Sequence, residues 1–195
     1  MIMPKLIFAC FWYLLPAALG NHNASCGNRL PIPGVLKKFL NKLAVPIDFG
    51  KTLNGREIFG KNKTWRGLVV GVVTGVLVAG IQALLFFKVN FFKNNTLIDY
   101  GQVNFVLLGA LMGLGALSGD LIESFIKRRL NKPSGKPWFP WDQVDWIIGA
   151  MILSSAVYQP GVKVVIVTLI LFTIVHLCSD RVVCLMGIKK REEVN

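Results

Sequence analysis

Residues 68–87 read LVVGVVTGVLVAGIQALLFF, a run of twenty residues without a charged side chain. A helix of about 20 apolar residues crosses the hydrocarbon core of a bilayer, so this run predicts a membrane-spanning helix. The composition agrees, because only 16% of the 195 residues are charged, whereas soluble domains carry about 25%. We therefore expect an all-α integral membrane protein.

Four further apolar segments flank this run and predict spans at about 6–19, 103–124, 144–158 and 162–178. Three of them, 6–19, 144–158 and 162–178, are short for a bilayer and need flanking residues to cross it. The prediction is one membrane domain over residues 1–195, with about five transmembrane helices. Two large loops, 20–66 and 125–143, connect them.

Lysine and arginine are unequally divided between the two sides of this arrangement. Loop 20–66 holds nine of them, loop 125–143 holds five, and the tail after Cys178 holds four, against four on the other side. The positive-inside rule then places both loops and the C-terminus in the cytoplasm and the N-terminus outside. We expect a multi-pass protein of the cell membrane.

The same cations bear on two alternative interpretations. The net charge of +12 can indicate nucleic-acid binding, but no basic helix or aromatic-basic RNA motif is present, so we expect no nucleic-acid partner. The first apolar segment also resembles a signal peptide. Cleavage there would export loop 20–66 with its cations, which favours a retained span.

The most polar stretch of the chain, SGDLIESFIKRRLNKPSGKPWFPWDQVD at 118–145, carries two carboxylate pairs. Asp120 and Glu123 lie three residues apart on one helix face, and Asp142 and Asp145 repeat the spacing at the start of the next apolar run. Carboxylates at the ends of spans are costly and usually functional, and Mg²⁺ is commonly held by one or two carboxylates plus substrate phosphates. Ordinary salt bridges of Asp120 and Glu123 with Lys127 and Arg128 are the alternative, and the second carboxylate pair favours a metal–phosphate site.

A second basic motif, GKNKTWRG at 60–67, lies directly before the span at 68–87. Glycine and backbone amides can approach phosphate oxygens while lysine and arginine supply charge. The motif lacks the spacing of a Walker A loop, and a basic collar at the membrane surface is an equally good interpretation. Upstream, residues 35–43 have an amphipathic pattern that predicts a helix lying along the membrane surface.

The segments GDLIESFIKRR at 119–129 and DQVD at 142–145 together resemble the CDP-diglyceride synthetase superfamily, most closely its CDP-archaeol synthase family. PIDFGK at 46–51, GKNKTWRG at 60–67 and the early pair Asn21 and Asn23 are also similar to elements of that family. The chain departs from bacterial CDP-diacylglycerol synthases, because it is shorter and has Gln143 where they carry arginine.

The resemblance implies a CTP-dependent cytidylyltransferase that converts a lipid phosphate to a CDP-lipid and pyrophosphate, with Mg²⁺ as cofactor. The implied lipid is 2,3-bis-O-geranylgeranylglycerol 1-phosphate, and diacyl phosphatidic acid is the alternative because no residue defines the tails. The expected partners are CTP, the lipid phosphate and the bilayer. The lipid phosphate is itself the nucleophile, so the chemistry needs positioning and charge neutralisation rather than a serine, cysteine or histidine. A transporter and a non-catalytic membrane protein are the competing classes.

Residue by residue, the resemblance and the spacing define one site. The expected catalytic and metal-binding residues are Asp120, Glu123, Asp142 and Asp145, and the expected CTP phosphate-binding residues are Lys51, Lys61, Lys63, Thr64, Arg66, Ser124, Lys127, Arg128 and Arg129. The sequence assigns no residue to the lipid phosphate and no oligomeric state. It does predict a groove for the lipid beside the small residues Gly109, Gly113 and Gly115.

Overall fold

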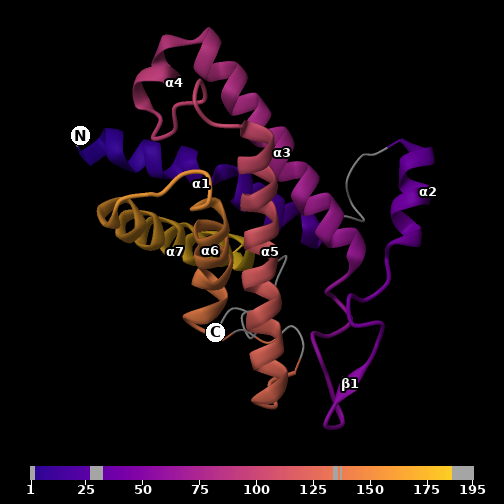
Figure 1. Cartoon of the computed structure of the whole chain (residues 1–195). Helices are drawn as coiled ribbons and strands as arrows, with labels where there is room; N and C mark the ends of the chain where they lie inside the picture. Colours follow the sequence, from indigo (N-terminus) through magenta and orange to yellow (C-terminus); the bar gives the residue numbers. More distant parts are fainter. Residues whose placement is uncertain (1–2, 27–32, 134–135, 137, 186–195) are drawn as a thin grey trace.

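The computed structural model describes residues 3–26, 33–133, 136 and 138–185, with only the backbone of 179–185. In that part the regular structure is mostly helical (Figure 1). The elements are α1 (Met3–Cys26), α2 (Gly34–Lys42), β1 (Thr52–Leu53), β2 (Arg56–Glu57), α3 (Trp65–Lys88), α4 (Asn90–Asn95), α5 (Phe105–Arg129), α6 (Trp141–Ser154) and α7 (Val162–Leu185). The predicted helical class is confirmed, and the small antiparallel hairpin of β1 and β2 was not predicted.

Three of these helices, α1, α3 and α5, are long and apolar enough to cross a membrane. α1 begins three residues before the predicted span 6–19 and ends seven residues after it, so with 24 residues the first segment is as long as α3. The apolar part of α7 is shorter, over Val162–Cys178. α6 has 14 residues, beginning at Trp141 and ending at Ser154, four residues before the predicted end.

The long helix α5 packs against α1, α3 and α6, and glycines line its contact with α3. A methyl carbon at Gly113 would lie 2.9 Å from the carbonyl oxygen of Gly71, and one at Gly109 would lie 2.5 Å from that of Gly75. The two backbones therefore touch, as small residues permit in membrane helices.

The same contacts overturn the groove expected beside Gly109, Gly113 and Gly115. The first two face the backbone of α3, and a methyl carbon at Gly115 would collide with the carbonyl oxygen of Gly149 on α6. These glycines leave no room for a lipid, because neighbouring helices fill the space that their missing side chains vacate.

The two large loops meet at one end of the helix bundle. The hairpin that precedes α3 lies beside the end of α5, where α6 also begins (Figure 1). At the same end the last turn of α1 approaches α3 closely, since a methyl carbon at Gly67 would lie 3.2 Å from the carbonyl oxygen of Ala24. Polar residues from four helices and one loop are thereby brought together.

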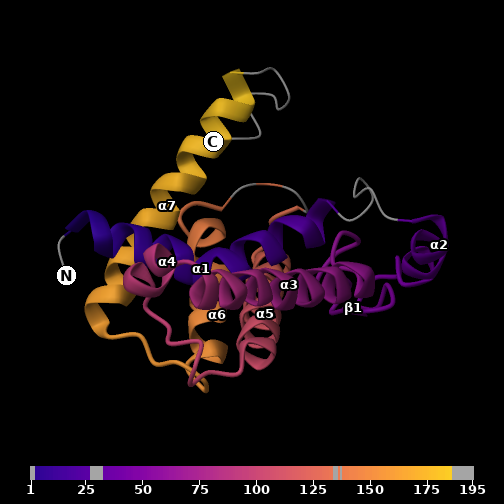
Figure 2. The same ribbon diagram turned by 90° about the horizontal axis from the view of Figure 1, so that it is seen from above.

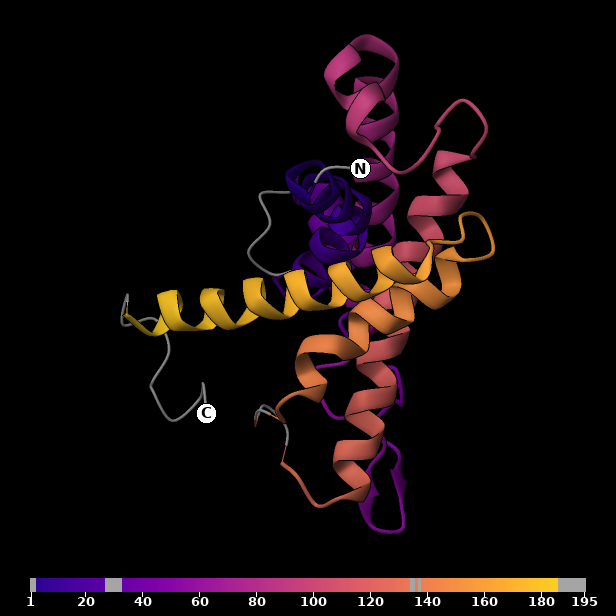
Figure 3. The same ribbon diagram turned by 90° about the vertical axis from the view of Figure 1, so that its left-hand side faces the viewer.

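Two helices extend from this core. α7 packs on α1 and α6 and then runs outward, so that its C-terminal half stands apart from the other helices (Figures 2 and 3). α2, the amphipathic helix predicted over residues 35–43, forms over Gly34–Lys42 and buries Leu40 while exposing Val35 and Phe39. Its position on a membrane surface stays a prediction.

Candidate metal and phosphate site

Three of the four predicted carboxylates converge across the seam between α5 and α6. One oxygen from each of Asp120, Glu123 and Asp145 lies within 4.8 Å of the others. Gly119 makes this possible, because a methyl carbon there would collide with the carbonyl oxygen of Asp145. The backbones of the two helices thus touch beside Asp120. Asp120 and Glu123, which the sequence placed on one helix face, therefore lie next to Asp145 of the neighbouring helix.

Asp142, the fourth predicted ligand, has different partners. Its Oδ2 accepts a hydrogen bond from the backbone N–H of Trp138 at 2.7 Å, and its Oδ1 lies 2.6 Å from the Nζ of Lys127. It therefore lies outside the group of three, although it is on the same helix as Asp145.

Two lysines form ion pairs with three carboxylates of the site. Lys127 is buried between Glu123 and Asp142, with its Nζ 2.8 Å from the Oε1 of Glu123. Lys63 reaches the cluster from the loop before α3, and its Nζ lies 2.5 Å from the Oδ2 of Asp120. The pair of Glu123 and Lys127 is the i,i+4 salt bridge that the sequence offered as an alternative. It is present together with the carboxylate cluster.

The loop that carries Lys63 is pinned at its base. The backbone N–H of Ile47 donates to the carbonyl oxygen of Lys63 at 2.8 Å, and that of Trp65 donates to Val45 at 3.1 Å. At the loop's end the Oγ1 of Thr64 accepts from the N–H of Gly67 at 3.2 Å and caps α3. The loop is thus joined rigidly to the start of a membrane helix.

Asp48 organises the interior of this loop and was missed by the sequence analysis. Its carboxylate accepts hydrogen bonds from the N–H groups of Gly50 at 2.9 Å and Phe59 at 3.0 Å. Burial favours the neutral acid, but the backbone N–H groups of Phe59, Gly50 and Gly60 outweigh it and hold the pKa of Asp48 below its ordinary value. The Asp-x-Gly pattern at 48–50 is typical of such a turn and could have indicated this role.

Arg129 fastens the hairpin to α5. Its guanidinium donates to the carbonyl oxygens of Leu53 at 2.7 Å, Glu57 at 2.6 Å and Arg56 at 3.3 Å. Arg56 in turn donates to the carbonyl oxygen of Arg129 at 2.7 Å. These contacts favour an anchoring role over the phosphate contact predicted for Arg129, because both terminal nitrogens of its guanidinium already donate within the chain and only Nε lacks a partner among the described residues.

The remaining predicted phosphate-binding residues differ in accessibility. Lys51 and Lys61 are exposed on the loop, and Arg66 is half-buried in the first turn of α3. Ser124 and Arg128 are buried on α5, where Arg128 donates to the carbonyl oxygen of Lys132 at 2.6 Å. Lys51 and Lys61 are therefore open to solution, whereas Ser124 and Arg128 are enclosed, and Arg128 holds the turn that follows α5.

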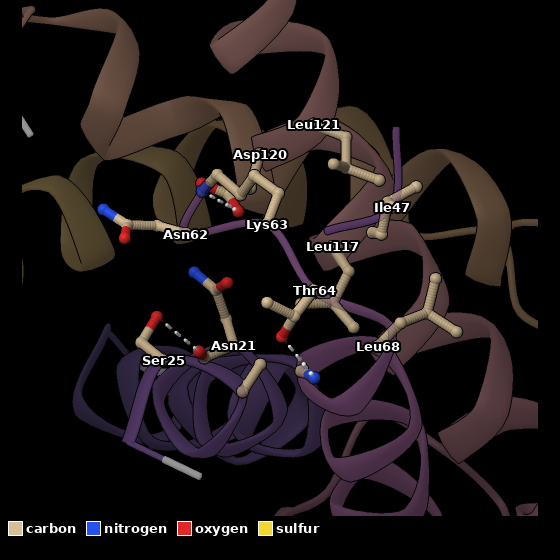
Figure 4. A pocket seen from close by; sticks show the side chains of 12 residues that line it. Asn21, Ser25, Ile47, Asn62, Lys63, Thr64, Leu68, Leu117, Asp120 and Leu121 are labelled. Atoms are coloured by element: carbon tan, nitrogen blue, oxygen red, sulfur yellow. Dashed lines mark hydrogen bonds and ion pairs between the residues drawn. The ribbon is translucent and has the colours of Figure 1, made fainter. Parts of the chain in front are cut away.

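Beside the carboxylate cluster lies a pocket between α1, α3, α5 and the loop (Figure 4). Its lining residues are Asn21, Ala24, Ser25, Ile47, Asn62, Lys63, Thr64, Gly67, Leu68, Leu117, Asp120 and Leu121. Asn21 and Ser25 were not predicted as site residues, because nothing local in the sequence shows that the end of α1 faces Asp120.

These features define a class of protein: a helical membrane protein with a carboxylate cluster suited to a hard divalent cation, next to a basic loop. Comparison with known proteins gives the family. A model of the CDP-archaeol synthase (CarS-like) family matches residues 3–192. The chain belongs to this family.

Individual relatives agree over most of their length. The CDP-archaeol synthase of Methanocaldococcus jannaschii is 35% identical, covering 95% of this chain and 96% of its own. The CDP-archaeol synthase of Pyrococcus furiosus is 37% identical, and the match covers 87% of this chain and 88% of that protein. A solved structure titled as an intramembrane enzyme for archaeal membrane lipids biosynthesis matches with a TM-score of 0.65 and 26% identity, covering 87% of this chain and 91% of that one.

Proposed function

We propose that this chain transfers the cytidylyl group of CTP to an archaeal lipid phosphate and releases pyrophosphate. The observation that carries the proposal is the meeting of Asp120, Glu123 and Asp145 with Lys63 at the end of the bundle where both loops converge. Membership of the CDP-archaeol synthase family supports the same reaction. The expected lipid is 2,3-bis-O-geranylgeranylglycerol 1-phosphate.

The carboxylate cluster fits a divalent cation of the magnesium type, because all its donors are oxygens and they converge from two helices. When bound, Mg²⁺ supplies charge neutralisation to the phosphates at the reacting centre. Asp120, Glu123 and Asp145 are the residues that would hold it. Asp142 contributes indirectly, because it shares Lys127 with Glu123 and so fixes the orientation of that carboxylate.

In the proposed reaction an oxygen of the lipid phosphate attacks the α-phosphorus of CTP. The bond from that phosphorus to the bridging oxygen of the β-phosphate breaks, and pyrophosphate leaves with the electron pair. The nucleophile is already an anion, so the chain has to position two negatively charged groups and reduce their repulsion. Lys51 and Lys61, which are exposed on the loop, are suited to the leaving pyrophosphate.

The membrane arrangement belongs to the same proposal. If α6 and α7 cross the membrane as well, the chain has five spans, and the cation bias favours a cytoplasmic position for both loops, where CTP is available. In a variant without the four native cysteines, a cysteine at Asn54 should react with an impermeant thiol reagent only from the cytoplasmic side. One at Asn94 should react only from outside, and the reverse pattern would contradict the orientation.

The function is tested with purified protein, CTP and Mg²⁺, offering either the archaeal diether phosphate or diacyl phosphatidic acid. We expect CDP-lipid and pyrophosphate in equal amounts, faster with the diether. Chelation of the metal should stop turnover and added Mg²⁺ should restore it. Turnover of neither lipid, or undiminished turnover in the chelator, would reject the proposal.

A further inference from the structure

The helix α2 presents apolar and basic side chains on separate faces. At 3.6 residues per turn, one face carries Val35, Leu36, Phe39, Leu40 and Leu43, and the remaining surface carries Lys37, Lys38, Asn41 and Lys42. Leu40 is buried, whereas Val35 is 86% exposed and Phe39 is 57% exposed. An open apolar face bordered by lysines is typical of a helix that lies in a lipid–water interface.

The charge of this segment has one sign. Residues 33–47 hold three lysines and no acidic residue. Among the described residues, none of these three lysines forms a salt bridge, so their charge is open to an external anion. A surface of anionic headgroups complements it, and each basic residue near such a surface strengthens binding about fivefold.

The position of α2 favours a membrane as the partner. α2 contacts α3 and lies near its start, away from the rest of the bundle (Figures 1 and 2). α3 is long and apolar enough to cross a membrane and begins at Trp65, so the surface of a bilayer around α3 is within reach of α2. A soluble protein or a nucleic acid would have to compete with a surface that is always adjacent.

Main-chain hydrogen bonds connect α2 to the loop that carries Lys63. Directly after α2, the carbonyl oxygen of Leu43 accepts from the N–H of Arg66 at 2.7 Å, and that of Val45 accepts from the N–H of Trp65 at 3.1 Å. Lys63, which meets the carboxylate cluster, lies two residues before Trp65. A displacement of α2 therefore disturbs the segment that positions this lysine.

We propose that α2 is a docking site for an anionic lipid surface, in which Val35, Leu36 and Phe39 enter the headgroup region while the lysines pair with lipid phosphates. Docking holds the loop of Lys63 in place, and this regulatory part rests on the proposed function. The rate of the reaction then depends on the charge of the surrounding leaflet, although no charged lipid other than the substrate takes part in the chemistry.

The first test measures docking without any reaction. The full chain without its native cysteines receives a nitroxide label at a cysteine replacing Val35 or, as the matched control on the other face, Asn41, and is placed in nanodiscs of phosphatidylglycerol or phosphatidylcholine. In phosphatidylglycerol we expect the label at Val35 to collide several-fold less often with a water-soluble nickel complex than the label at Asn41, and this difference should shrink in phosphatidylcholine. Equal collision rates for the two labels in phosphatidylglycerol would overturn the proposal and leave the face to a soluble partner.

The second test separates the lysines of α2 from the net charge of the chain. One variant replaces Lys37, Lys38 and Lys42 by glutamine, and the control replaces the exposed Lys5, Lys88 and Lys93 at the other end of the bundle. We expect the wild type and the control to react about fivefold or more faster in phosphatidylglycerol than in phosphatidylcholine, and the α2 variant to lose that difference.

An α2 variant that keeps the full difference between the two lipids would overturn the regulatory role. Wild-type protein that is inactive in both lipids would instead reject the proposed function. The nickel collision rates would still decide the docking in that case, so the two failures are distinguishable.

Discussion

The acidic and basic halves of the site are held in place by different forces. The carboxylates are fixed by backbone contact between α5 and α6, at a seam where Gly119 and Gly149 have no side chains to separate the helices. Lys127 meets them from α5 itself, whereas Lys63 is fixed by hydrogen bonds within a loop that Asp48 and Arg129 organise. Close packing tolerates little change in volume, whereas a hydrogen-bonded loop can lose one contact and keep its fold. Single substitutions in the carboxylate half should therefore abolish activity, whereas single substitutions in the loop half should only reduce it.

The largest effect is expected from the carboxylates themselves. Asp145→Asn and Asp120→Asn remove a charge from the converging cluster and should reduce cytidylyl transfer to background, while the purified protein stays folded by circular dichroism. Asp142→Asn is the matched control on α6, because Asp142 lies outside the group of three. It should lower the rate only partially. An equal loss of activity in all three variants would contradict the distinction between Asp120 and Asp145 as ligands and Asp142 as a supporting residue.

The next largest effect should follow from Gly119→Ala, which leaves every charged group in place. The added methyl would meet the carbonyl oxygen of Asp145 and push α6 away from α5, at a cost of about 1–3 kcal/mol in stability. Activity should fall strongly together with the thermal midpoint. Gly80→Ala is the control, because a methyl there would lie 3.5 Å from a ring carbon of Phe105, an ordinary contact. Wild-type activity in Gly119→Ala would show that the seam does not position the cluster.

A smaller and more local effect is expected on the basic side. Arg129→Ala removes the donors that hold the hairpin, and hydrogen bonds to charged groups contribute about 1.5–3 kcal/mol each. Amide hydrogen exchange should accelerate at 52–57 and leave the centre of α5 unaffected. Since the loop also carries Lys63, the KM values should rise more than kcat falls. Unchanged exchange in the hairpin would contradict the anchoring role of Arg129.

The smallest effect is predicted for the pH dependence of the loop through Asp48. Its pKa is lower in the folded protein than its ordinary value, so its stabilising contribution is complete above that ordinary value. The contribution is lost as the pH falls through the folded pKa. Asp48→Asn should therefore make the exchange of the Phe59 amide less dependent on pH in the acid range. Asp99→Asn, which alters a similar turn at Gly101 in another loop, should leave Phe59 unaffected.

The parts of this fold that could be predicted from sequence are those that depend on local patterns. Apolar runs located the long helices, and the three-residue spacing of Asp120 and Glu123 placed both on one face of α5. That Asp145 meets them follows from two consecutive helices packing side by side. The basic motif before α3 was recognised, and Lys63 from it does reach the cluster.

The parts that could not be predicted depend on contacts between distant residues. Arg129 and the carbonyl of Leu53 are 76 residues apart, and no local pattern shows that one donates to the other. The glycines of α5 were expected to leave a groove, but a glycine does not reveal whether a helix or a ligand fills the space beside it, and here α3 and α6 fill it. Asn21 faces the site only because the last turns of α1 pack against α3.

The ion pair of Lys63 and Asp120 has a consequence for the order of events in turnover. The ammonium group already balances that carboxylate, so Asp120 itself is not an uncompensated anion at the edge of the bilayer. Arrival of a divalent cation would then be an exchange, in which Lys63 is displaced and becomes available to an incoming phosphate. Lys63 would thus couple metal binding by the carboxylates to phosphate binding by its own ammonium group, so that metal and substrate bind cooperatively.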